Sequence, residues 1–248
     1  MLTGAGPYSC PRTYRIPVEA DRELELPGGR ITPGVVRVGD TVRRPVGAHS
    51  PFVHRLLALL ESRGVTAAPP FHGLDDRGRE ILTFHDGWVP PNLEYRTWSD
   101  EQLVAAARIV RELHDATAGT ELAGEAEVVC HGDLSPCNFV FVDGKPTFVI
   151  DFDRAHPGSR KSDLAYLAWL WLIGSEDDPA RPFAARLAQL PVLLDAYGLD
   201  DRAGFAAAIE AEQREVLGDG TGIGADWARS EVAFVRANAQ RIDAAALG

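Results

Sequence analysis

Short alternating runs of apolar and polar residues dominate positions 23–87 and predict β-strands. These runs lie at 24–29, 35–47, 70–76 and 79–87. The second run is expected to turn on itself at Gly39-Asp40, and the last two are joined by a turn near 75–78. Between the hairpins, apolar residues at helical spacing predict one helix over 51–62. The preceding segment 1–22 is rich in Gly and Pro, and we expect it to be flexible.

Residues 88–248 show instead the 3.6-residue periodicity of amphipathic helices. Ser99 and Gln102 form a capping-box pattern at the start of one helix, and Gly119 supplies its end. Further helices are expected near 163–173, 181–197, 201–217 and 225–246. A strand-rich region followed by a helical region predicts an α+β fold, in which 23–87 form a small lobe and 88–248 a larger one.

The segment between these helices, 130–166, contains the candidate chemistry. Asp133 and Asn138 have the D-x-x-x-x-N spacing of a kinase catalytic loop. Two apolar runs then flank an Asp-Gly pair over 139–150, which is a strong hairpin signal. Because a hairpin reverses the chain, Asn138 and Asp151 should lie side by side. The sequence therefore predicts that Asp133, Asn138 and Asp151 converge on one site.

These three residue types suit phosphoryl transfer from a nucleotide. Mg²⁺ prefers oxygen ligands, and when phosphates supply several of them, one carboxylate and one amide oxygen suffice. Asp151 and Asn138 are the candidates for those two ligands. Asp133 is then left to orient an acceptor hydroxyl and to accept its proton. The alternative is that these residues are ordinary turn residues beside a buried hairpin.

The segments HGDLSPCN, IDFD and SDLAYLAW resemble the aminoglycoside phosphotransferase and choline kinase superfamily, and the similarity continues more weakly across most of the chain. The resemblance implies a protein-kinase-like two-lobed fold with a small β-rich N-lobe and a larger helical C-lobe. It also implies roles for particular residues: Asp133 as the catalytic base, Asn138 and Asp151 as Mg²⁺ ligands, and His131 and Asp163 as supports of the catalytic loop. For Asp153 two roles stay open, namely support of the metal site or capping of the loop that follows.

The chain departs from the kinase pattern at the residue that holds the phosphates. Kinase-like enzymes use a lysine on the third strand, whereas both lysines of this chain, Lys145 and Lys161, lie in the second region. The equivalent strand offers Arg43 and Arg44, and strand alternation places Arg44 in the position of the usual lysine. A guanidinium can engage two phosphate oxygens, so we expect Arg44 to contact the nucleotide. The alternative is that both arginines belong to a solvated strand face.

The glutamate that normally orients this lysine is also absent from its usual helix. No acidic residue occurs between positions 45 and 60. His54 lies on the helix predicted there, but a neutral imidazole cannot play the same role. Contacts to the nucleotide base are expected from the backbone around 83–87, where the two regions join.

Composition restricts the partners of the protein. Apolar and charged fractions of 45% and 25% are typical of globular proteins, and a net charge of -11 without a basic stripe argues against nucleic acid. The first residues lack the pattern of a secretory signal, and the longest apolar segment, 164–174, is too short to span a bilayer. Cys10, Cys130 and Cys137 form no C-x-x-C pair and have the wrong spacing for a zinc site with His131. We therefore expect a cytoplasmic protein without membrane contacts.

Three functions are compatible with this sequence. The first is a kinase that moves the γ-phosphoryl group of ATP or GTP to a hydroxyl of a small molecule. The acidic excess favours a basic acceptor such as an aminoglycoside or another basic antibiotic. The second is a binding or immunity protein on the same fold with little turnover, which the missing lysine and glutamate motivate. The third is a metal-dependent phosphohydrolase that uses Asp133, Asp151 and Asp153.

Overall fold

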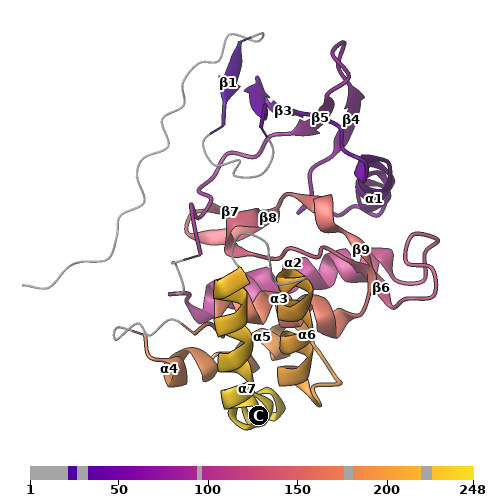
Figure 1. Ribbon diagram of the computed structural model, residues 1–248. Coiled ribbons are helices and arrows are strands. Elements are labelled where there is room, and N and C mark those ends of the chain that lie inside the picture. The colour runs from indigo at the N-terminus through magenta and orange to yellow at the C-terminus, as the bar shows by residue number, and fades with distance from the viewer. Residues whose placement is uncertain (1–21, 27–32, 94–96, 176–180, 219–224) are drawn as a thin grey trace, which may run out of the picture.

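The computed structural model describes residues 22–26, 33–93, 97–175, 181–218 and 225–248. The segment expected to be flexible, 1–22, lies outside these ranges except for its last residue. Within them the chain forms an antiparallel sheet with one helix, followed by a helical region (Figure 1). This is the expected α+β arrangement of a small β-rich lobe and a larger helical lobe.

The sheet has five strands in the order β1-β2-β3-β5-β4. Its strands are β1 (Glu23–Glu25), β2 (Val36–Val38), β3 (Thr41–Arg44), β4 (Phe71–Leu74) and β5 (Glu80–Thr83). Both predicted hairpins are present, β2 with β3 and β4 with β5. The middle pair, β3 and β5, is in a register that places Arg44 directly opposite Glu80.

Helix α1 (Ser50–Ser62) confirms the single helix predicted in this region. Its buried face includes Val53, Leu56, Leu57 and Leu60, and this face joins the main hydrophobic core. The opposite side of the helix is exposed, and α1 lies beside the edge strand β4 (Figure 1).

The segment that connects the sheet to the helices is attached to both. The Phe84 backbone N–H donates to Asp40 O at 2.9 Å, which ties this end to the sheet. The next residue, His85, stacks on Phe148, and the Trp88 and Phe141 backbones pair at 2.8 and 2.7 Å. From His85 onwards the connection therefore follows the hairpin that carries the candidate catalytic residues.

The helical region contains α2 (Asp100–Thr117), α3 (Arg160–Trp171), α4 (Phe183–Leu187), α5 (Leu190–Tyr197), α6 (Phe205–Leu217) and α7 (Ala225–Leu247). The Ser99–Gln102 capping box of α2 is present as predicted. Two short strands, β6 (Val128–Cys130) and β9 (His156–Gly158), pair antiparallel and were not predicted, because three residues are too few to show alternation.

The main differences from the predicted helix boundaries are in α3, in α4 with α5, and in α6. Helix α3 begins three residues early because the Ser159 side chain caps it, accepting from the Ser162 backbone N–H. The single helix expected over 181–197 is two helices, since Pro191 lies in the first turn of α5 and cannot continue a preceding helix. Helix α6 begins at Phe205 rather than 201, after Gly204 in the left-handed conformation.

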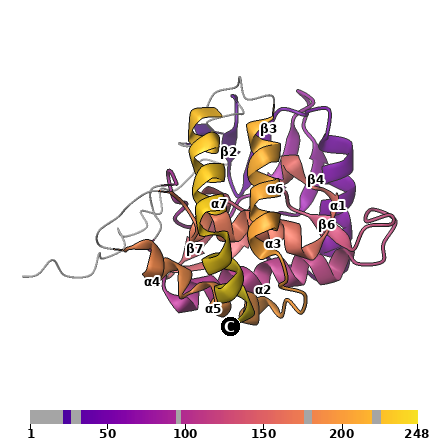
Figure 2. The same ribbon diagram turned by 60° about the horizontal axis from the view of Figure 1, so that its bottom comes forward.

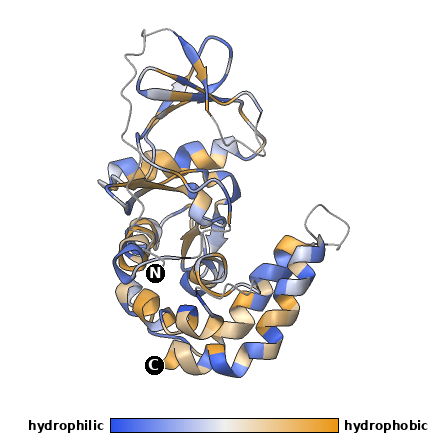
Figure 3. Ribbon diagram, turned by 90° about the vertical axis from the view of Figure 1, so that its left-hand side faces the viewer, coloured by the Kyte–Doolittle hydropathy of each residue, from blue (hydrophilic) through white to orange (hydrophobic). Residues whose placement is uncertain are grey.

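Helix α3 lies at the centre of the helical region and is buried on every side from Asp163 to Trp171. It packs on α6, which lies alongside α7 (Figure 2). Viewed from the side, the helices curve into a crescent below the sheet (Figure 3). The hairpin over 139–149 lies between the two regions (Figure 1). In the described ranges, none of the helices combines the length and the apolar character needed to cross a bilayer.

Candidate active site

The predicted hairpin is present and brings two of the site residues together. Strands β7 (Phe139–Val142) and β8 (Lys145–Val149) are joined by Asp143 and Gly144, whose φ angles of 50° and 78° are typical of a type I′ turn. At its open end the Ile150 backbone N–H donates to Asn138 O at 2.8 Å. Asn138 and Asp151 are thus placed side by side, as the sequence predicts.

The loop before the hairpin is held by hydrogen bonds that involve His131 and Asn138. The Asp133 backbone N–H donates to His131 Nδ1 at 3.2 Å. The Nε2 of a neutral ring therefore carries the proton, and it donates to Ile150 O at 3.0 Å. The Asn138 side-chain N–H donates to Asp133 O at 2.9 Å, which fixes the amide and leaves its Oδ1 for a cation. These contacts connect His131 with both ends of the loop.

Asp163 of α3 anchors the same loop from below. Its two carboxylate oxygens accept from the backbone N–H groups of His131 and Gly132 at 2.8 and 3.0 Å. His114 of α2 adds a third contact at 2.9 Å. Burial by itself favours the neutral acid, but His114 and the backbone donors outweigh it and hold the pKa of Asp163 below its ordinary value. Asp163 is therefore a buried carboxylate whose partners stabilise its charge.

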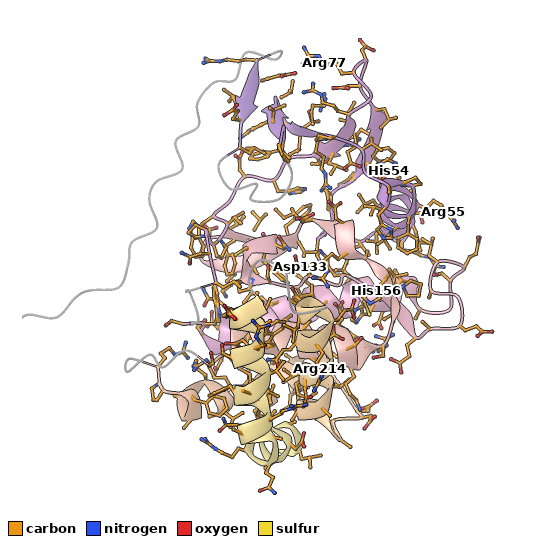
Figure 4. The ribbon with its side chains drawn as sticks, in the orientation of Figure 1. His54, Arg55, Arg77, Asp133, His156 and Arg214 are labelled. Atoms are coloured by element: carbon orange, nitrogen blue, oxygen red, sulfur yellow. The ribbon has the colours of Figure 1, made fainter. Side chains whose placement is uncertain are left out.

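Tyr166 contacts the predicted base and was missed by the sequence prediction. Its hydroxyl donates to Asp133 Oδ1 at 3.1 Å. Burial, together with the charge of Asp133, raises the pKa of Tyr166, so the phenol stays a donor. The signal was available: Tyr166 follows Asp163 by three residues on one helix, which places both on the side that faces the catalytic loop. Asp133 itself lies between the sheet and the helices (Figure 4).

Arg44 reaches across from the sheet to the carboxylates that follow the hairpin. Its Nη1 lies 3.4 Å from Asp151 Oδ1, and its Nη2 pairs with Asp153. Arg43 occupies the other face of β3, where it hydrogen-bonds Thr41 and lies 3.9 Å from Asp75. Of the two candidate phosphate ligands, the structure brings Arg44 to the site and places Arg43 away from it.

The carboxylate partner of this cation comes from a strand rather than from α1. Glu80 of β5 lies with Oε1 2.7 Å from Arg44 Nε, and its side chain is 3% exposed. The other oxygen, Oε2, lies 2.6 Å from Nε2 of His54 on α1. This partner was not predicted, because none of the residues between positions 45 and 60 is acidic. A glutamate that shares the buried face of its strand with Leu82 was the signal for it.

Asp151 and Asn138 fit a hard divalent cation. Asp151 has a φ of 68°, the left-handed conformation that aspartate tolerates better than most residues. Burial and the neighbouring Asp153 raise the pKa of Asp151, although Arg44 opposes the shift. A carboxylate in such surroundings gains from a cation, and an amide oxygen beside it is a suitable second ligand. With Asp133 and Arg44 adjacent, the cluster offers a base, two metal ligands and a cation for phosphates.

Comparisons with known proteins agree with this geometry. The sequence profile of the phosphotransferase enzyme family APH matches residues 5–208. The chain is 36% identical over 202 residues, 72% of this chain and 75% of the relative, to the trifolitoxin immunity protein of Rhizobium leguminosarum bv. trifolii.

Two solved structures resemble the fold. An ethanolamine kinase of Plasmodium vivax matches with a TM-score of 0.59 at 12% identity, over 84% of this chain and 80% of the kinase. APH(2")-IIa, in its ternary complex with streptomycin and ATP, matches with a TM-score of 0.51 at 14% identity, over 87% and 92% of the two chains. At these identities the likeness concerns the fold alone.

Proposed function

Because the chain belongs to the phosphotransferase enzyme family, we propose that it moves the γ-phosphoryl group of ATP or GTP to a hydroxyl of a small molecule. The observation that carries the proposal is the arrangement of Asp133, Asn138 and Asp151 around the catalytic hairpin, with Arg44 3.4 Å from Asp151. Such a site needs a nucleotide triphosphate, and we place the enzyme in the cytoplasm, where these nucleotides are available.

Asp133 is the base in this mechanism. It accepts the proton of the acceptor hydroxyl as the oxygen forms a bond to the γ-phosphorus. The bond from that phosphorus to the bridging oxygen of the β-phosphate breaks, and a nucleoside diphosphate leaves. Tyr166 donates to one oxygen of Asp133, which keeps the other oriented toward the acceptor. Arg44, whose two Nη groups lie beside Asp151 and Asp153, would contact the phosphates of the bound nucleotide.

Asn138 and Asp151 would hold Mg²⁺ when the nucleotide binds. The ion would neutralise charge on the phosphates, which is what an oxygen-rich pair of ligands is suited for. The contribution of the chain itself is to hold the backbones of both ligands side by side at one end of a hairpin. Asp153 accompanies them by pairing with the second Nη group of Arg44.

A basic acceptor fits this protein best. The net charge of -11 attracts cations, and among the structures that share the fold, one holds streptomycin together with ATP. An aminoglycoside or another basic antibiotic is therefore the class that we propose to test first, with antibiotic resistance as the biological outcome. Amino alcohols form the second class, since kinases of ethanolamine share the fold.

A second candidate function is immunity by binding, without turnover. It is favoured by the 36% identity to an immunity protein and by the arginine in place of the usual lysine. The two functions differ in one respect. A kinase protects only while Asp133 can accept a proton, whereas a binding protein protects equally well without that carboxylate.

The test begins with calorimetric titration of ATP and GTP, with and without Mg²⁺, into the wild type, Asp151→Ala and Asp133→Asn. We expect Mg²⁺-dependent binding that Asp151→Ala abolishes and Asp133→Asn retains. Release of nucleoside diphosphate should depend on an acceptor and fall by about 10²–10⁴-fold in Asp133→Asn. Phosphate release without an acceptor would favour the phosphohydrolase.

Two results would overturn the proposal. If the wild type bound neither ATP nor GTP, the proposed kinase activity would be refuted. Full protection of cells by Asp133→Asn, against a toxin or antibiotic from which the wild type protects them, would move the binding protein into first place.

A further inference from the structure

Glu80 contacts Arg44 and His54 at the same time, with a different oxygen for each. Oε1 lies 2.7 Å from Arg44 Nε, and Oε2 lies 2.6 Å from His54 Nε2. A carboxylate paired with a guanidinium is an acceptor, so the imidazole Nε2–H is the donor in the second contact. Both oxygens of Glu80 therefore have a partner, although its side chain is 3% exposed.

The two residues beside Glu80 are fixed independently of each other. Arg44 is the cross-strand neighbour of Glu80 in the β3–β5 register. His54 comes from α1, and its ring is stacked almost parallel on Phe71 of β4, with centroids 3.7 Å apart. It points from α1 towards the sheet (Figure 4). The helix and β4 thus hold the imidazole in place independently of its contact with Glu80.

The geometry decides which nitrogens of Arg44 are available. A carboxylate and a guanidinium prefer a bidentate pair, in which both oxygens engage two N–H groups. Here His54 occupies the second oxygen, and Glu80 meets Arg44 only at Nε, in an ion pair at 2.7 Å in which the Nε–H makes no hydrogen bond. The Nη1 and Nη2 groups are left to project beyond the sheet, where they meet Asp151 and Asp153.

We propose that His54 is a positioning residue for nucleotide binding. By occupying one oxygen of Glu80, it prevents a bidentate Glu80–Arg44 pair and keeps both Nη groups of Arg44 directed at the phosphates. Helix α1 is thereby coupled to the phosphates through a histidine and a strand glutamate instead of through a glutamate of its own. This inference rests on the proposed nucleotide-dependent function.

Two substitutions separate the hydrogen bond of His54 from its ring. His54→Phe keeps a ring to stack on Phe71 and removes the donor. His54→Gln loses the ring and keeps an N–H near the position of Nε2. The matched control is His72→Phe on β4, because His72 Nε2 lies 2.7 Å from Thr83 Oγ1 in the same sheet and does not contact Glu80.

We expect His54→Phe to weaken Mg²⁺-nucleotide binding about tenfold in calorimetry, which corresponds to losing one hydrogen bond to a charged group. The KM for nucleotide should rise by a similar factor, with kcat and the acceptor KM within about twofold of the wild type. His54→Gln should recover binding to within about threefold, and His72→Phe should match the wild type. A lysine at position 44 has no guanidinium to form a bidentate pair with Glu80. In an Arg44→Lys background, His54→Phe should therefore change nucleotide binding by less than about twofold.

The wild type and Asp151→Ala are titrated alongside, so that the two proposals fail separately. If the wild type binds nucleotide, Asp151→Ala does not, and His54→Phe binds as tightly as the wild type, the role of His54 is refuted while the proposed function stands. Equal weakening in His54→Phe and His54→Gln would also refute it, because keeping the N–H donor would then make no difference to binding. Should His54→Phe fail to fold, His54→Met removes the same donor and still packs on Phe71. An absence of binding in the wild type refutes both proposals.

Discussion

Two aspartates on either side of the catalytic loop show opposite ways of using a carboxylate. Asp163 is 2% exposed, accepts three hydrogen bonds and has a lowered pKa. Asp151 is partly exposed, sits in a left-handed backbone conformation and has a raised pKa even though Arg44 lies 3.4 Å away. The charge of Asp163 is stabilised by partners within the protein, whereas the charge of Asp151 would be stabilised further by a bound cation.

We infer from this difference that Asp163 anchors the catalytic loop and that Asp151 is suited to bind a ligand. The Asp163 region contributes stability, because every partner of its charge belongs to the protein. The Asp151 region contributes binding, because its charge is only partly satisfied until a partner arrives from solution. The same substitution at the two positions should therefore have very different consequences.

The largest effect is expected from Asp163→Asn. Whichever oxygen the new amide NH2 replaces, it faces a backbone N–H donor, that of His131 or that of Gly132, and the contact with His114 loses its charge. Disrupting a buried group of this kind costs about 3–5 kcal/mol in the free energy of unfolding. Denaturant titration measures it. The control is Asp195→Asn, whose exposed pair with Arg202 should be worth less than about 1 kcal/mol. A similarly small loss at Asp163 would contradict its role as an anchor.

Gly132→Ala should have the next largest effect. A Cβ there would lie 2.3 Å from the carbonyl oxygen of Arg154, and the φ of 76° already disfavours a side chain. We expect the free energy of unfolding to fall by about 2–3 kcal/mol. Gly124→Ala is the matched control, since Gly124 has a φ of 59° but no atom within 4 Å of the added Cβ. It should cost about 1 kcal/mol. Equal losses would show that backbone conformation, and not close packing of the loop, is what matters.

Glu212 of α6 is another partly buried carboxylate, and it should make the stability of the protein depend on pH. Burial, with the charges of Glu215 and Asp163, raises the pKa of Glu212 to about 7, above its value of about 4.3 in an unfolded chain. The native protein thus binds a proton that the unfolded chain lacks, and stability from this group is present at low pH and lost as pH rises towards 7.

Glu212→Gln should accordingly stabilise the protein at pH 8 by about 1 kcal/mol, a figure reduced for screening by solvent, and by almost nothing at pH 4.5. Unfolding free energies at the two pH values provide the test. Glu210→Gln should show the opposite trend, because Arg236 and Arg214 lower the pKa of Glu210. A Glu212→Gln difference that does not change with pH would disprove the titration.

Asp151→Asn should have the smallest effect on stability, less than about 1 kcal/mol in the same denaturant titration used for Asp163→Asn. Asparagine tolerates the left-handed conformation, and the carboxylate that it replaces is incompletely paired. Mg²⁺-dependent nucleotide binding should nevertheless be lost. A loss of stability as large as that of Asp163→Asn would show that both aspartates are anchors.

The sequence predicted the parts of the site that follow from local order. The spacing of Asp133 and Asn138 and the Asp-Gly turn were sufficient to place Asn138 beside Asp151, because a hairpin constrains its two ends. Most helices and both sheet hairpins were predicted from the periodicity of apolar residues, which is also a local property of the sequence. The break between α4 and α5 could have been predicted from Pro191, and the apolar residues on both sides obscured it.

Partners from separate elements could not be predicted in this way. The carboxylate of Glu80 reaches Arg44 through the register of β3 on β5, and His54 joins them from α1. No spacing along the chain encodes a contact among three elements. Tyr166 is intermediate, since helical geometry relates it to Asp163 but only the packing of α3 on the loop brings it to Asp133.

The attachment of the connecting segment has a mechanical consequence. Phe84 is hydrogen-bonded to the sheet and His85 stacks on β8, so the connecting segment passes from one region to the other within a single peptide unit. Gly87 packs so closely on Val140 that the segment beyond it moves with the catalytic hairpin. Arg37 of β2 spans this junction by pairing with Asp86 at 2.9 Å. Arg44 joins the same two regions through Asp151 and Asp153. An opening motion would therefore break ionic contacts, and we expect its rate to increase with ionic strength.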